Sequence, residues 1–249
     1  MRIESDREMS PAWILVVIVP IFIAIISLVV LFGTLFSLAA TPPGAGASAG
    51  FFAALIGLFV LVQLVALITQ IIYAYMLYKL VNRRNKHFQR QLFVYDDLTN
   101  LAKELAAKKG VDVSLALNNM QRTNQEARFE ETEKSAALWA IVTFFIGITA
   151  LYVYYFLMKD FYKHERREDI FIEDLNRTLM AAGVTINLPR RTLPVPDRSF
   201  ALYLILSIIT LGIFSIYWLY VLLTDPNSHF RQQALIEDTV LTQVAPVLA

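Results

Sequence analysis

The sequence predicts an all-α integral membrane protein with four transmembrane helices, on the basis of its composition and three uncharged runs. Hydrophobic residues make up 57% of the 249 residues and charged residues only 17%, whereas an ordinary soluble domain is about 45–50% apolar and about 25% charged. No Asp, Glu, Lys, Arg or His occurs between Met9 and Tyr78, within 135–158, or within 199–224.

The first uncharged run predicts two crossings. A helix spans the hydrocarbon core of a bilayer with about 20 residues, so the run is too long for one. It is interrupted by a turn-forming stretch, 39–50, that contains Pro42 and Pro43. We therefore expect helices at about 12–38 and 51–79, with Ser10 as the cap of the first. A cleaved signal peptide is the alternative for the first helix, but the segment before it is mixed in charge rather than basic.

The other two runs are each long enough to cross once, which gives four crossings. Lys and Arg number two before the first helix, none in 39–50, eleven in 79–134, eight in 159–198 and one in the C-terminal tail. Basic residues favour the cytoplasmic side, so we expect both termini in the cytoplasm, with the eight in 159–198 outside. If the third run were re-entrant, both large basic segments would lie on one side.

A repeated pattern links the last three hydrophobic segments. Each contains two tyrosines three residues apart, and a histidine follows the first tyrosine after twelve residues. The three sets are Tyr75, Tyr78 and His87; Tyr152, Tyr155 and His164; and Tyr217, Tyr220 and His229. The shared spacing predicts three related units, each a span followed by a helix.

The chain accordingly divides into four parts. Residues 1–50 hold the first span and its turn, and 51–135 hold the second span with a cytoplasmic helical hairpin. Residues 136–198 hold the third span, a helix and a linker rich in proline, because Pro189, Pro194 and Pro196 prevent a continuous helix there. Residues 199–249 hold the fourth span and an interfacial helix.

The last part also carries a family resemblance. Segment 209–220 reads Ile-Thr-Leu-Gly-Ile-Phe-Ser-Ile-Tyr-Trp-Leu-Tyr and is followed by Asp225-Pro226-Asn227. Residues 198–240 resemble a prokaryotic membrane-domain family, domain of unknown function 4234. The earlier two units lack the Thr-Leu-Gly and Tyr-Trp elements. The resemblance implies a multi-pass membrane protein and no particular chemistry.

The sequence predicts no catalytic residue, no cofactor and no metal site. Cysteine is absent, which removes thiolate ligands and cysteine nucleophiles. Each histidine is followed by an acid about ten residues later, which lies about 15 Å away along a helix and cannot share an ion with it. Histidines of different units could combine only on one side of the membrane, and four crossings place His164 on the other side.

Two further sets of residues are candidates for contacts within or beside the membrane. Gln63 and Gln70 lie seven residues apart on one face of the second span, where we expect them to hydrogen-bond between helices. A juxtamembrane basic cluster is expected to contact lipid headgroups. Its members are Lys79, Arg83, Arg84, Lys86 and Arg90.

The predicted function is that of a non-catalytic accessory or structural subunit of the cell membrane. We expect membrane lipids and a protein partner or a second copy of the chain as its contacts, and no nucleic acid, because the net charge is only +1. A small transporter or channel built from the repeated units is the first alternative. An interfacial lipid-modifying enzyme is the second.

Overall fold

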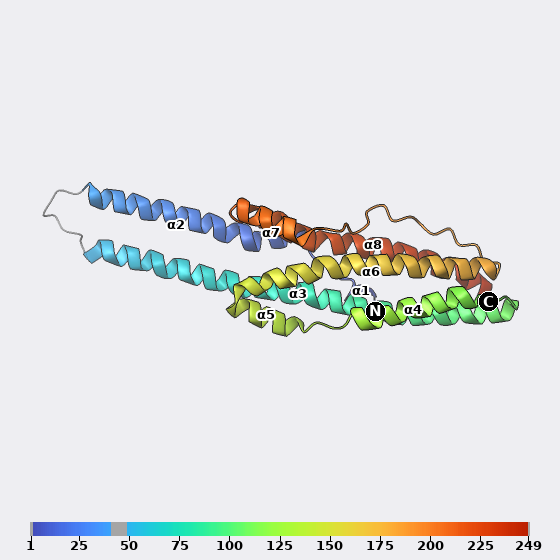
Figure 1. The fold of residues 1–249 in the computed structure, drawn as a ribbon. Coiled ribbons are helices and arrows are strands. Elements are labelled where there is room, and N and C mark those ends of the chain that lie inside the picture. Colours follow the sequence, from blue (N-terminus) through green and yellow to red (C-terminus); the bar gives the residue numbers. More distant parts are fainter. Residues whose placement is uncertain (1, 41–48, 249) are drawn as a thin grey trace.

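The structure, a computed structural model, describes residues 2–40 and 49–248, and all regular elements within these residues are helices. Two helices project from one end of an elongated molecule, and the remaining helices pack lengthwise at the other end (Figure 1). In chain order they are α1 (Arg2–Ser5), the 3₁₀ helix η1 (Pro11–Ile14), α2 (Leu15–Ala39), α3 (Ala49–Lys109), α4 (Ser114–Glu130), α5 (Ala136–Phe145), the 3₁₀ helix η2 (Gly147–Thr149), α6 (Ala150–Ala181), α7 (Phe200–Ile209) and α8 (Ile213–Leu248).

The projecting pair consists of α2 and the first half of α3. Both helices are long and apolar enough to cross a membrane, and large apolar side chains such as Phe22, Phe36 and Phe59 are exposed along them. Ser10 caps the entry as predicted, because its hydroxyl accepts a hydrogen bond from the Ala12 amide. The turn predicted at 39–50 falls largely within 41–48, outside the described residues.

The third and fourth uncharged runs do not form single crossing helices, so that prediction is wrong. In the third run, α5 ends at Phe145 and α6 begins at Ala150 after a 3₁₀ turn. In the fourth, Leu211 and Gly212 adopt left-handed φ angles of 51° and 91°, which end α7 and reverse the chain into α8. Each run is therefore a helical hairpin whose first arm has ten residues, a rise of about 15 Å against a hydrocarbon core of about 30 Å.

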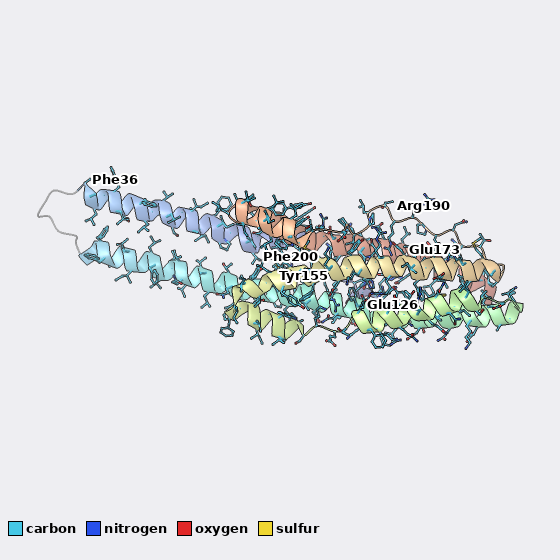
Figure 2. All side chains as sticks on the ribbon, in the orientation of Figure 1. Phe36, Glu126, Tyr155, Glu173, Arg190 and Phe200 are labelled. Atoms are coloured by element: carbon cyan, nitrogen blue, oxygen red, sulfur yellow. The ribbon has the colours of Figure 1, made fainter. Side chains whose placement is uncertain are left out.

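The other end of the molecule is a bundle built on α3, α6 and α8, with α4 packed alongside (Figure 1). Corresponding positions of the three units are buried together, as shown by Leu80, Leu157 and Leu222, which are at most 4% exposed. The charged residues labelled on α4, α6 and the linker, such as Glu126, lie on the outside of this region (Figure 2).

Several local predictions hold in the bundle. Gly110 ends α3 with φ +63°, and 184–198 is free of helix, as its prolines require. The predicted interfacial helix of the last part is not separate: α8 continues through Pro226, and Phe230 and Ile236 are buried in the bundle. The division of the chain into four parts stays a prediction.

Candidate metal centre

The three histidines meet at one point in the bundle, one from each of α3, α6 and α8. The His87 Nε2 atom lies 3.2 Å from Nε2 of His164 and 3.2 Å from Nε2 of His229. All three side chains are fully buried. The prediction that His164 lies across the membrane from the other two is therefore wrong, since the hairpin in the third run returns the chain to the end of the molecule that holds His87 and His229.

A carboxylate fixes the other nitrogen of each ring. Nδ1 of His87 is 2.8 Å from Asp6, Nδ1 of His164 is 3.0 Å from Glu131, and Nδ1 of His229 is 2.8 Å from Glu165. Ionised carboxylates only accept hydrogen bonds, so the tautomer that fits these contacts donates from Nδ1 and leaves a lone pair at Nε2. In that tautomer the three Nε2 lone pairs converge on one another.

These carboxylates come from three different elements and are themselves paired with arginines. Asp6 lies in the segment between α1 and η1, and its Oδ2 is 3.0 Å from Arg90. Glu131 follows α4 and pairs with Arg167, while Glu165 lies on α6, 3.5 Å from Arg191. Such outer partners orient histidine ligands and raise their basicity in metalloproteins.

The electrostatics keep His87 neutral and its surroundings charged. Burial, followed by the neighbouring His164 and His229, lowers the pKa of His87 well below its usual value. Burial alone would raise the pKa of Glu131, but His164 and Arg167 outweigh it and lower that pKa. An uncharged imidazole with a free Nε2 is the form that binds a metal ion.

Glu168 adds a fourth oxygen-bearing side chain beside the rings. It lies one turn beyond His164 on α6, is 1% exposed, and its Oε2 is 3.8 Å from Nε2 of His229. Arg191 pairs with Oε2, whereas Oε1 has no hydrogen-bond partner among the described residues. At the corresponding positions Gln233 donates to Gln91, so this layer also contains one residue from each helix.

Aromatic rings enclose the histidines. The Phe88 ring stacks on His164 with centroids 4.3 Å apart, and Phe230 lies 4.5 Å from His87. The Phe161 ring lies beside His87 and His229, with its centroid 6.2 Å from the centroid of each imidazole. An apolar enclosure of this kind excludes water and strengthens electrostatic interactions inside it.

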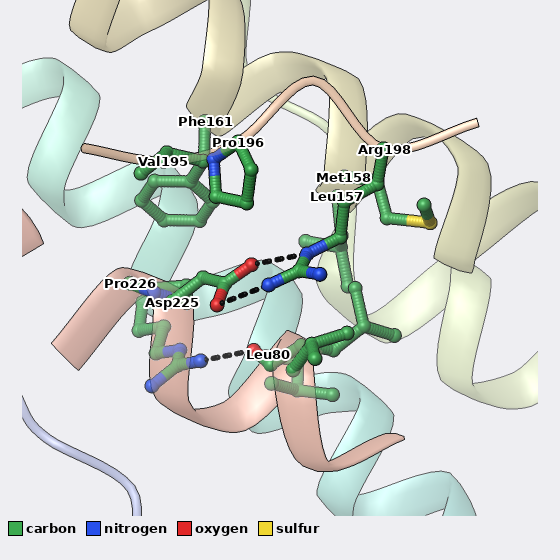
Figure 3. A pocket seen from close by; sticks show the side chains of 12 residues that line it. Leu80, Leu157, Met158, Phe161, Val195, Pro196, Arg198, Asp225 and Pro226 are labelled. Carbon is green, nitrogen blue, oxygen red and sulfur yellow. Dashed lines mark hydrogen bonds and ion pairs between the residues drawn. The ribbon is translucent and has the colours of Figure 1, made fainter. Parts of the chain in front are cut away.

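A small pocket lies beside this enclosure, between Phe161 and the apolar hairpins (Figure 3). Arg198 from the linker closes it through two hydrogen bonds to Asp225, of 2.9 and 3.1 Å. Leu80 and Leu157 supply apolar lining. The pocket holds the linker against α8 and contains no histidine among its lining residues.

The tyrosine pairs lie on the outer surface, several turns before the histidines. Each pair is stacked with ring centroids 6.3–6.4 Å apart, and all six rings are exposed. They are Tyr75 and Tyr78, Tyr152 and Tyr155, and Tyr217 and Tyr220. Both Gln63 and Gln70 are exposed on α3, and the Gln70 amide donates to the carbonyl of Phe144 at the tip of α5.

The basic cluster divides into buried and accessible members, which corrects the prediction that all five contact headgroups. Arg83 donates to the Leu222 carbonyl, Arg84 pairs with Asp160, and Arg90 pairs with Glu237. These three arginines are at most 8% exposed, so they stabilise the bundle instead. Lys79 and Lys86 stay accessible.

Sequence reasoning missed the carboxylates of the centre because they have no common position in the units. Asp6 precedes the first unit, and Glu131 directly follows α4. Glu165 contacts His229 but is the neighbour in sequence of His164, whose own carboxylate partner is Glu131. One signal was available: the only three histidines occupy the same position in the three units.

Comparison with known families extends this description only at the C-terminus. No curated protein and no solved structure gives a significant match to the chain. Residues 198–246, which include α7, most of α8 and His229, match the model of a family described as "Domain of unknown function (DUF4234)".

Proposed function

We propose that the protein is a non-catalytic, membrane-anchored metal-binding subunit whose bundle is held together by a divalent late transition-metal ion such as Zn²⁺. The observation that carries this proposal is the convergence of three Nε2 lone pairs, each fixed by a carboxylate at the opposite nitrogen.

The spacing of the nitrogens fits an ion better than an empty core. Zn²⁺ binds imidazole nitrogen at about 2.0–2.1 Å in tetrahedral geometry, which places two ligand nitrogens about 3.3–3.4 Å apart. The two measured separations are 3.2 Å. Without a cation the lone pairs repel one another in a site with no water to solvate them.

The enclosure supports a structural role for the ion. The three histidines supply the nitrogens that converge on one point, and structural zinc sites are closed to solvent and substrate. A catalytic site keeps an open position for substrate, whereas Phe88 and Phe161 cover these rings. A scaffold or accessory role is therefore favoured over an enzyme.

The anchor consists of two crossings, α2 and the first half of α3, with the bundle in the cytoplasm. Arg2 hydrogen-bonds to Asp238, so both ends of the chain lie on the bundle side. With two crossings instead of four, all 22 Lys and Arg residues lie on that side and none in 39–50, which agrees with the positive-inside rule. Cytoplasmic placement of both termini thus has stronger support than the four-crossing arrangement gave it.

Three related units explain why the centre has three similar arms. Corresponding positions supply the histidines, the layer of Gln91, Glu168 and Gln233, and the buried leucines. A repeated unit in which an apolar segment leads into a bundle helix places one histidine per copy at the same point of the bundle. A further protein partner or a second copy would then bind outside this core, and lipids would surround the anchor.

Metal binding is tested with the full-length protein in detergent, stripped with a chelator and titrated with Co²⁺. We expect one Co²⁺ per chain with the intense visible absorption of a tetrahedral site, displaced by Zn²⁺. Asp6→Asn should weaken binding about 10- to 100-fold, as outer-partner substitutions do. His229→Gln should abolish the absorption, while the matched variant Gln232→Asn, three residues away, should leave it unchanged.

The proposal fails if the stripped, folded protein binds no Co²⁺, or if His229→Gln binds it as the parent does. Circular dichroism of each variant separates loss of a ligand from loss of the fold.

The anchor is tested by labelling single cysteines in the cysteine-free chain. Ile170 is an exposed residue of α6. A cysteine at this position should react with a membrane-impermeant thiol reagent from the same side as a cysteine at position 2. Reaction from the opposite side would contradict the two-crossing anchor.

A further inference from the structure

The two hairpins that replace the third and fourth crossings carry a large, unexplained apolar surface at their tips. Phe145, Ile146 and Ile148 at the first tip are 55–77% exposed, and Ile209, Leu211 and Ile213 at the second are 70–94% exposed. A soluble protein rarely exposes contiguous apolar patches of this kind without an occupant.

The occupant follows from where the tips lie. Both hairpins point in the same direction as the α2–α3 anchor and lie beside its base (Figure 1). The Gln70 amide of α3 reaches the Phe144 carbonyl, so the first tip is level with the apolar part of the anchor. The exposed tips thus continue the lipid-facing surface of α2 and α3, and acyl chains are the medium that covers them.

The depth follows from the arm lengths. Each first arm has ten residues, α5 and α7, and rises about 15 Å, half of a hydrocarbon core of about 30 Å. The exposed tyrosine pairs of the returning arms lie one to two turns behind the tips, because α6 begins at Ala150 and α8 at Ile213. Amphipathic rings favour the interfacial part of a bilayer, so the tips extend only a short way beyond that level. The hairpins therefore end within the leaflet that faces the bundle.

From this geometry we infer that the hairpins α5–α6 and α7–α8 insert only into the leaflet facing the bundle, and that the protein thereby favours membranes that are convex on the bundle side. The bundle-side leaflet contains α2, α3 and both arms of each hairpin, whereas the far leaflet contains α2 and α3 alone. This unequal cross-section expands one leaflet relative to the other. The inference rests on the proposed two-crossing anchor.

Tip insertion is measured with a nitroxide on Ile146→Cys in the full-length protein, reconstituted in phosphatidylcholine vesicles. We expect high accessibility to oxygen and low accessibility to a water-soluble nickel chelate, as for a position within the hydrocarbon core. Strong nickel accessibility would overturn the inference. Shielding from both reagents would also overturn it, because a protein surface would then cover the tip.

The preference for curvature is measured by distributing the protein between small and large vesicles of the same lipid. We expect a several-fold higher density on small vesicles, among molecules with the bundle outside. The double variant Ile148→Lys with Leu211→Lys should lose this preference. The matched double variant Leu115→Lys with Phe129→Lys places the same charges on exposed apolar positions of α4 and should keep it.

The outcomes separate the inference from the anchor. Loss of membrane flotation by the parent protein would refute the anchor itself. Flotation with an equal density of protein on both vesicle sizes would refute the preference for convex membranes and leave the anchor intact. An unchanged preference in the Ile148→Lys and Leu211→Lys variant would do the same.

Discussion

The anchor and the bundle of this protein are opposite in where they place polar groups. Along α2 and the first half of α3, apolar side chains such as Phe36 face outward, and no residue of α2 is buried. In the bundle, charged side chains such as Arg84 and Glu168 lie inside at 0–1% exposure. The same helical conformation therefore carries an outward-facing apolar surface in one region and a buried polar interior in the other, and α3 passes between the two within a single helix of 61 residues.

We expect stability to be concentrated in the bundle. In the proposed anchor, packing between the helices would replace lipid contact with little gain, since lipid is as apolar as the side chains. Burial in the bundle removes apolar surface from water and pairs charges that would otherwise be stranded. Substitutions of equal size should thus have unequal effects in the two regions.

The largest difference is expected for phenylalanine. Phe171→Ala removes a fully buried ring stacked on Tyr95 at 4.2 Å and should cost about 4 kcal/mol of unfolding free energy. Phe59→Ala removes a ring that is 63% exposed on α3 and should cost less than about 0.5 kcal/mol. Reversible unfolding in mixed micelles measures both, and equal losses would erase the contrast.

A buried ion pair gives the next effect. Asp160→Asn leaves the fully buried Arg84 without its 2.8 Å carboxylate partner and should cost about 3 kcal/mol. Glu173→Gln breaks a pair with Arg177 in which both side chains are more than 60% exposed, and should change stability by at most about 1 kcal/mol. The same unfolding assay ranks the two, and the reverse ranking would contradict the burial argument.

Removal of the ion should affect the bundle and leave the anchor unchanged. Zinc at about 100 times its dissociation constant contributes about 2.7 kcal/mol. Chelation should accordingly speed amide hydrogen exchange around His87 and His229, with no change in α2. Uniform exchange throughout the chain, with or without the chelator, would argue against a metal-held bundle.

Glycine substitutions should give the smallest effects, of opposite sign. Gly110→Ala forces a side chain into φ +63° at the end of α3 and should cost about 1–2 kcal/mol. Gly57→Ala lies within the helix with open space around it and should be neutral or stabilising by up to about 1 kcal/mol. Thermal unfolding of the two variants, compared with the parent, checks the signs.

Local sequence rules predicted most of the helices and failed where long-range contacts decide. The cap at Ser10, the end of α3 at Gly110 and the proline linker all follow from residues within a few positions. The hairpin at Leu211-Gly212 was missed because hydropathy counts residues and does not see a backbone reversal inside an apolar run.

In the candidate site, too, the local pattern could be predicted and the long-range contacts could not. The equal spacing of the three histidines was visible, but the predicted topology placed His164 on the far side and removed it from consideration. Asp6 could not be predicted as the partner of His87, because 81 residues separate them and no shared pattern links them. The backbone reversal inside an apolar run, rather than its composition, decides which ligands can meet.

The contact between the two ends of the chain has a consequence for biosynthesis. Arg2 hydrogen-bonds to Asp238, 236 residues later in the chain. The cluster of three histidines likewise combines His229 of α8 with His87, whose Nδ1 contacts Asp6. The three histidines can therefore meet only after α8 has been translated. A polypeptide terminated before His229 would lack one ligand of the proposed ion, so it would not retain the metal that the longer chain is proposed to bind.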